Sequence, residues 1–227
     1  MRKKVDDFQG APANVTGLEV LARRILSGDF IPGQPLRETV LSQQLGLSRN
    51  AIREALNQLV GVSIVEYIPY CGYRMRDFTP RDLLEWYEFR EGIEPIAARR
   101  LAVARPPEAI ASLEQALKEM EDAIGSGDEA AIFQSDRSFH LALVGSCGNH
   151  IFSRLHNTLY LATLFVNNVK FSKVQEISLI NAYTLAVHGE ILRCIKAGLA
   201  DASEAIVRDH IHRHVEKYTK LLGADSL

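Results

Sequence analysis

Apolar residues recur every three or four positions along most of the 227-residue chain, which is the spacing of helices with one buried face. The N-terminal part predicts three successive helices, over VTGLEVLARRILSG, ETVLSQQLG and SRNAIREALNQLV. Gly28 and Gly46 are expected to end the first two, and the Ser48 hydroxyl is placed to cap the third. The residues expected to face inward are Leu18, Leu21, Ile25 and Leu26, then Val40, Leu41 and Leu45, then Ile52, Leu56 and Leu59. Two short helices joined by a tight turn after a support helix are the layout of a helix-turn-helix.

The pattern changes over SIVEYIPYCGYRMRDF, which is rich in Ile, Val and Tyr. Pro69 to Gly72 interrupts this stretch in the manner of a hairpin tip. It predicts two short strands, at about 64–68 and 73–76, which would form a β-hairpin wing.

From Thr79 onward the pattern is helical and is cut into about six helices by breaks at 105–107, 125–127, 145–149, 167–173 and Gly198. Thr79 with Pro80 should open the first of these helices, Asp128 the third, and Asp201 should cap the last. The sequence therefore predicts a mainly α protein, with a winged helix-turn-helix at residues 1–76 and an all-helical bundle at residues 77–227.

Composition and charge refine this picture. The chain is 47% hydrophobic and 24% charged, as is usual for a globular protein, and it has no apolar run long enough to span a membrane and no signal peptide, so we expect a cytoplasmic location. Its three cysteines are far apart and favour neither disulfides nor a cysteine zinc site. Residues 1–76 carry 10 Lys and Arg against 7 Asp and Glu, whereas the remainder is acidic. A mildly basic N-terminal part is compatible with a surface that meets phosphates.

The start of the predicted third helix has the residue types of a DNA-reading helix. Ser48, Arg49 and Asn50 begin it, and Arg53 lies one turn further on the same face. Arg can pair with guanine through two hydrogen bonds and Asn with adenine, while Ser48 and the first backbone amides can hold a phosphate. An ordinary capped surface helix with two arginines is the alternative.

DRSFH places Asp136 and His140 on one face of a helix whose other residues are largely apolar. Buried polar groups need partners or a metal. His188 shares a face with apolar residues of a later helix, as does His210 in the last one, where His214 is the second choice; His150 and His156 are expected in loops or at the surface. Asp136, His140, His188 and His210 would offer three imidazole nitrogens and one carboxylate to Zn, Ni, Mn or Fe. A hydrogen-bonded polar cluster is the alternative.

LRETVLSQQLGLSRNAIREALNQL, with the strand pair and helices after it, resembles the winged-helix regulators of the GntR family. Asn50-Ala51 stands where the family usually has Thr-Pro, and Ser63 where it has Gly. The resemblance implies that Ser48, Arg49, Asn50, Arg53 and the wing residues Gly72 and Tyr73 contact DNA, although Tyr73 is equally compatible with packing inside the strand pair.

The C-terminal half resembles the FCD effector domain of the FadR-like branch. The resemblance implies that Asp136, His140, His188 and His210 bind a divalent metal, because they match the ligand pattern of its metal-binding subgroup. It also implies that Arg90 binds an effector carboxylate; an ion pair of Arg90 with Glu94 or Glu91 is the alternative. The expected protein is a homodimeric regulator, a repressor of operator DNA relieved by a small carboxylic acid and not an enzyme. A metal-assisted hydrolase is the competing hypothesis.

Overall fold

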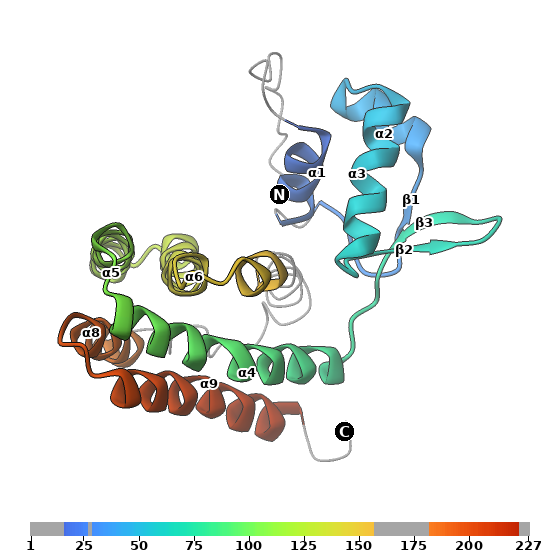
Figure 1. Cartoon of the computed structure of the whole chain (residues 1–227). Coiled ribbons are helices and arrows are strands. Elements are labelled where there is room, and N and C mark those ends of the chain that lie inside the picture. Colours follow the sequence, from blue (N-terminus) through green and yellow to red (C-terminus); the bar gives the residue numbers. More distant parts are fainter. Residues whose placement is uncertain (1–15, 27–28, 157–181, 223–227) are drawn as a thin grey trace. The chain divides into compact units, whose positions relative to one another are not determined.

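The computed structural model describes residues 16–26, 29–156 and 182–222. The chain divides into two compact units, Met1–Asp77 and Phe78–Leu227, each with an apolar core of its own (Figure 1). Three sequence predictions concern parts that lie outside this description: the helix end at Gly28, the inward direction of the Leu26 side chain and the break at 167–173.

Within the described residues, the first unit contains three helices and one small sheet, which confirms the predicted winged helix-turn-helix. The helices are α1 (Gly17–Leu26), α2 (Glu38–Leu45) and α3 (Arg49–Gly61). The strands are β1 (Pro35–Leu36), β2 (Val65–Ile68) and β3 (Gly72–Met75), antiparallel in the order β1-β3-β2. The sequence did not predict β1, because two residues after a Pro/Gly turn are too few to display an alternating pattern.

The turn between α2 and α3 forms for the reasons the sequence suggests. Gly46 ends α2 with a φ of 65°, and the Ser48 hydroxyl accepts a hydrogen bond of 3.2 Å from the Ala51 amide at the start of α3. Leu41 is buried beneath this turn. The expected inward direction of Val40 was wrong: its side chain is 42% exposed, because an eight-residue helix packs only a narrow stripe against its neighbours.

The turn from α3 into the sheet contains Ser63 at a φ of 57°, in the left-handed region that favours glycine. This is the position at which the resemblance noted from the sequence implies Gly. The Ser63 amide donates to the Val60 carbonyl over 3.0 Å, so the tight turn forms despite the side chain. The wing that follows is retained, with Tyr67 opposite Tyr73 in the β2–β3 register.

All the regular secondary structure described in the second unit is helical, as predicted. Its helices are α4 (Pro80–Ala104), α5 (Pro107–Ser126), α6 (Glu129–Gly145), α8 (Ala182–Lys196) and α9 (Ala200–Leu222), and residues 150–156 are also helical. α4 runs beside α9, and α5 beside α6 (Figure 1). Buried Leu101, Leu113, Phe139, Ile191 and Val207 come from five different helices and form the core between them.

Helix starts in this unit follow the sequence with one exception. Thr79 forms a capping box with Asp82 ahead of Pro80, and the Asp128 carboxylate accepts from the Ala131 amide over 3.1 Å. Asp201 is not the cap of α9. It lies inside the first turn and forms an ion pair with Arg99 of α4, so its carboxylate is used between helices.

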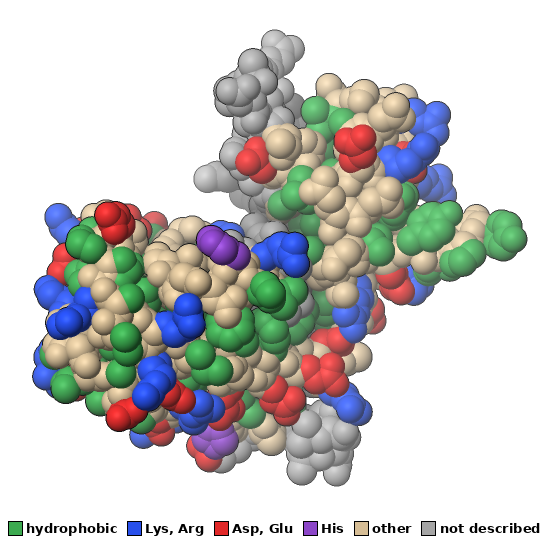
Figure 2. All heavy atoms as spheres, viewed as in Figure 1, with side chains coloured by type: hydrophobic (Ala, Val, Ile, Leu, Met, Phe, Trp, Pro, Cys, Tyr) green, Lys and Arg blue, Asp and Glu red, His purple; other side chains and the backbone are tan. Residues whose placement is uncertain are grey.

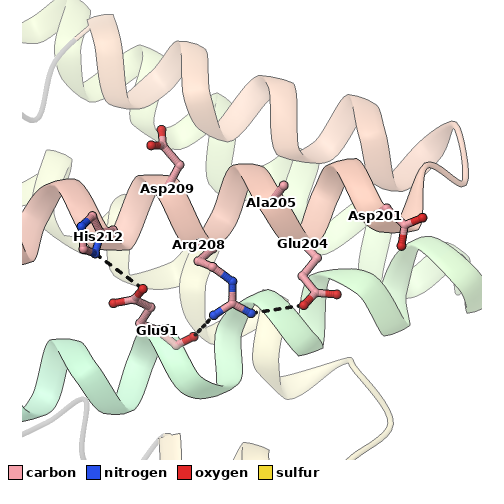
Figure 3. A pocket seen from close by; sticks show the side chains of 7 residues that line it. All are labelled: Glu91, Asp201, Glu204, Ala205, Arg208, Asp209 and His212. Atoms are coloured by element: carbon pink, nitrogen blue, oxygen red, sulfur yellow. Dashed lines mark hydrogen bonds and ion pairs between the residues drawn. The ribbon is translucent and has the colours of Figure 1, made fainter.

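α4 carries a proline in its interior, at Pro95. Because proline has no amide hydrogen, it cannot donate to the carbonyl of Glu91 one turn earlier. Arg208 of α9 donates to that carbonyl over 3.4 Å, and its other terminal nitrogen pairs with Glu204 over 3.2 Å (Figure 3). A surface groove between α4 and α9 is lined by these groups and by His212, which lies 3.6 Å from Glu91. Arg208 thus supplies from a neighbouring helix a hydrogen bond that the proline removes.

We expect Thr79→Ala to lower the free energy of unfolding of the second unit by about 1 kcal/mol, because it removes the capping box of α4. Trp86 is the chain's single tryptophan and lies buried in the second turn of α4, so its fluorescence in a urea titration reports this unit. Val103→Ala, at an exposed position of the same helix, is the control and should change the midpoint little. Equal midpoints for both variants would show that the cap is not stabilising.

Candidate functional site

The N-terminal end of α3 presents the arginines that the sequence singles out. The side chains of Arg49 and Arg53 are 61% and 50% exposed. Both face Glu38 in the first turn of α2: Arg53 Nε lies 2.9 Å from Glu38 Oε1 and Arg53 Nη2 2.7 Å from Oε2, while Arg49 Nη2 lies 3.9 Å from Oε2. The hydrogen bond from Arg53 lowers the pKa of the Glu38 carboxyl. One carboxylate therefore orients both arginines at the helix end, beside Ser48 and Asn50.

Of the wing tyrosines that the sequence predicts near DNA, Tyr70 is exposed and Tyr73 is buried. Tyr73 is only 8% exposed, and its hydroxyl donates to Asn57 Oδ1 of α3 over 2.7 Å. Packing between the sheet and α3, the alternative noted from the sequence, explains Tyr73 better than DNA contact. Tyr70 at the tip is fully exposed, and Figure 2 shows the hairpin as an apolar projection of this unit. Tyr70 and Gly72 both have positive φ, of 65° and 87°, as the turn requires.

In the second unit, three helices bring together the four candidate metal ligands. His140 comes from α6, His188 from α8 and His210 from α9, and one ligand atom of each lies within 4.8 Å of the others. The Nε2 atoms of His188 and His210 are 3.2 Å apart. Asp136 Oδ1 lies 3.7 Å from His188 Nε2 and 3.9 Å from His140 Nε2. The i, i+4 spacing in α6 thus directs Asp136 and His140 at the two later histidines.

These distances fit a metal centre. Donors bound at about 2.1 Å to one ion lie roughly 3–4 Å apart, close to the separations found here. All three histidines are at most 3% exposed. Phe139 stacks on the His188 ring at 4.2 Å between centroids and so fixes its plane. A cluster joined only by its own hydrogen bonds would leave these close nitrogens poorly satisfied.

The electrostatics of the cluster favour metal binding over protonation. Burial, followed by the neighbouring histidines, lowers the pKa of His188 well below its usual range, and the same causes lower the pKa of His210. Both rings are therefore neutral near pH 7, the form in which imidazole binds metals. Burial raises the pKa of the Asp136 carboxyl. A bound cation would favour its ionised form.

A buried glutamate that the sequence reading did not propose as a site residue lies behind the cluster. Glu94 of α4 is 0% exposed. Its Oε2 atom lies 2.6 Å from His140 Nδ1, and its Oε1 atom accepts from Arg90 Nε at 2.6 Å and lies 3.0 Å from His156 Nε2. Burial alone would raise the pKa of the Glu94 carboxyl, but Arg90, with His140 and His156, holds that pKa well below its usual range.

Arg90 and His156 can now be placed. Arg90 is 6% exposed and forms the ion pair with Glu94 that was the alternative to effector binding. Because Glu94 also contacts His140, the same pair puts Arg90 next to the histidine cluster. His156 was expected at the surface, and this was wrong: it is 1% exposed, in the helical segment after Asn149. His214, the second choice in α9, is half-buried and stacks on Tyr87 at 5.7 Å.

Glu94 shares a face of α4 with buried Ala98 and Leu101. This helical spacing is the sequence pattern from which the burial of Glu94 could have been predicted.

Each of the two units matches a known protein family. Residues 18–74 match the family of bacterial regulatory proteins named gntR, and residues 85–213, more than half of the chain, match the FCD domain. The chain belongs to the GntR family, in the group that carries an FCD domain. It is accordingly a DNA-binding transcriptional regulator.

Individual relatives support the same assignment. The chain is 31% identical over 144 residues to the uncharacterized regulator YdhC of Bacillus subtilis. The matched stretch covers 62% of this chain and 64%, just under two thirds, of that protein. It is 26% identical over 195 residues to a probable D-xylose utilization operon transcriptional repressor of Paenarthrobacter nicotinovorans, covering 85% and 83%. Both names are those of regulators, whereas the sequence alone also left a metalloenzyme open.

A solved structure shows the same fold. A putative GntR regulator from Rhodococcus sp. RHA1 superposes with a TM-score of 0.72 at 21% identity, over 88% of this chain and 94% of that one.

Among the helices of the described ranges, none is both long enough and apolar enough to cross a membrane.

If the cluster is a metal centre, the purified regulator should hold close to one divalent transition metal per chain, and His188→Ala should hold far less, because it removes a ligand at the centre of the set. Elemental analysis of protein dialysed against metal-free buffer measures this. His212→Ala is the matched control, since His212 is also on the bundle but 54% exposed by its side chain. Equal metal content in the wild type and His188→Ala would reject His188 as a ligand.

Proposed function

We propose that this regulator reads operator DNA with the N-terminal end of α3. The supporting observation is the pair of exposed arginines, Arg49 and Arg53, one turn apart at a capped helix start. Their guanidinium groups can pair with guanine in the major groove, and Asn50 between them can pair with adenine. Ser48 and the first amides of α3 are suited to a phosphate, and Gly72 at the wing lets the backbone approach the DNA closely.

The pairing of both arginines with Glu38 is compatible with this role. The arginine side chains of both pairs are at least half exposed, so a phosphate or a guanine edge can replace Glu38 at low cost. Until then Glu38 holds the guanidinium groups near the conformation that reads DNA. We further propose that two such units, one from each chain of a homodimer, meet two half-sites of the operator.

In the second unit we propose a sensor for a small carboxylic acid. Asp136, His140, His188 and His210 would hold a divalent metal, Zn, Ni, Mn or Fe, and that metal would supply an open coordination position for an oxygen of the acid. Arg90 is separated from the His140 ring only by the Glu94 carboxylate, so its positive charge lies close to the same place. Guanidinium is suited to a carboxylate because it can donate two parallel hydrogen bonds.

Effector binding in the bundle would shift the regulator between states that differ in their affinity for DNA. We propose repression that the acid relieves, in keeping with the name of the Paenarthrobacter relative, a transcriptional repressor. The metal would serve to bind the acid and would take no part in hydrolysis.

Arg49→Ala should weaken binding to the preferred operator by about 1–3 kcal/mol, because it removes a base or phosphate contact. The operator is first selected from random duplexes with wild-type protein, and affinities are then measured by fluorescence anisotropy at several salt concentrations. Arg81→Ala removes the same charge from an exposed site on α4 and should bind as the wild type does. An unchanged affinity for Arg49→Ala would exclude this assignment.

A sensor built on the metal predicts that acid binding depends on metal. We expect at least one member of a panel of small mono- and dicarboxylic acids to bind the zinc-loaded regulator in a calorimetric titration. The same acid should release the regulator from the selected operator. Binding should disappear after the metal is removed with a chelator, and the matching amides should not bind. An acid that binds equally well to metal-free protein would argue against the metal as part of the effector site.

A further inference from the structure

The Glu94 carboxylate has an unusual position, because it is fully buried and serves three basic side chains. His140 approaches one oxygen from α6, and Arg90 from α4 and His156 from the segment after Asn149 approach the other. The Arg90 guanidinium, which always carries its hydrogen atoms, donates to Oε1 over 2.6 Å, and a carboxylate paired in this way acts as a hydrogen-bond acceptor toward its other partners. The ring nitrogens that face it must therefore carry hydrogen atoms.

This requirement determines which nitrogen of His140 faces the metal cluster. Nδ1 is 2.6 Å from Glu94 Oε2, so the hydrogen atom of the neutral ring belongs on Nδ1. The lone pair is then on Nε2, the atom that lies 3.9 Å from Asp136 Oδ1. The ring is also held in place by its neighbours, since it lies nearly parallel to His210 at 5.6 Å and edge-on to His188 at 5.0 Å.

We propose that Glu94 is a positioning residue for the metal centre: it holds His140 in the tautomer and orientation that present Nε2 to the ion. The inference rests on the proposed metal site. Carboxylates that accept from the second ring nitrogen of a metal-bound histidine fix its orientation and increase its basicity, and their loss typically lowers metal affinity about 10–100-fold. Glu94 also joins His140 to Arg90, so one carboxylate connects the proposed metal ligand with the proposed effector-binding arginine.

Glu94→Gln is the informative variant, because it preserves the shape of the side chain. Glutamine has one accepting oxygen and one donating amide group, so it cannot accept hydrogen bonds on both sides, and at least one of the three basic groups loses its partner. We expect zinc affinity to fall about 10-fold or more. The measurement is a competition titration of the full chain against a chromophoric chelator.

Glu91→Gln is the matched control for this titration. Glu91 lies one turn before Glu94 on the same helix, but its carboxylate faces the surface groove and His212 (Figure 3). It should bind zinc as tightly as the wild type. Failure of the wild type to bind zinc would reject the proposed metal site itself. Equal binding by wild type and Glu94→Gln would overturn the role of Glu94 and leave the site in place.

A second measurement needs no variant at Glu94 and so does not depend on how well that variant folds. Long-range proton–nitrogen NMR correlations of the metal-free, nitrogen-15-labelled regulator distinguish the two tautomers of each histidine. His140, assigned by the signals missing in His140→Asn, should show a protonated Nδ1 and an unprotonated Nε2. A ring of His140 protonated at Nε2 would overturn the inference, whatever the zinc titration gives.

Discussion

The buried charge of Glu94 is the constraint on which the second unit depends. An ionised carboxylate removed from water is costly unless positive charge and hydrogen bonds replace the solvent. Here the positive charge comes from Arg90, one turn earlier on α4. Further donors come from His140 on α6 and from His156 in the helical segment after Asn149. Removing one partner of such a buried pair typically costs about 3–5 kcal/mol. The carboxylate therefore requires these segments to meet at one point, and the cluster of histidines forms on the far side of His140.

The helix that carries Glu94 shows how this position is maintained. Pro95 follows directly and removes a hydrogen bond from the turn that contains Glu91, and Arg208 of α9 replaces it. The same stretch of α9 also contributes His210 to the cluster, two residues further along. α4 and α9 are thus joined on their outer surface by Arg208 and in the interior by the network that Glu94 and the histidines form. A shift of α9 along α4 would disturb both contacts together, which makes the bundle a suitable frame for ligands that must keep fixed distances.

Much of the fold could be predicted from the sequence, and part of the candidate site. Helical spacing placed Asp136 and His140 on one face and His188 and His210 on buried stripes, because each of these relations is local to one helix. The predictions that were wrong or incomplete concern contacts between residues of different elements. Glu94 was named only as an ion-pair partner of Arg90, since nothing in α4 alone shows that two histidines approach it from other segments. His156 was assigned to the surface for the same reason. The hydroxyl of buried Tyr73 likewise donates to Asn57, which lies in a different element.

The two units use the pairing of arginine with glutamate in opposite ways. The pair of Arg53 with Glu38 lies at the surface, where water screens it and a phosphate can replace the carboxylate with little loss. The pair of Arg90 with Glu94 is buried, and separating it would leave both charges without solvent. The first pair is therefore exchangeable, which suits an arginine that we propose contacts DNA. The second is a permanent part of the bundle, so in the proposed sensor an acid would be recognised beside the intact pair of Arg90 and Glu94, and its affinity would come largely from the proposed metal.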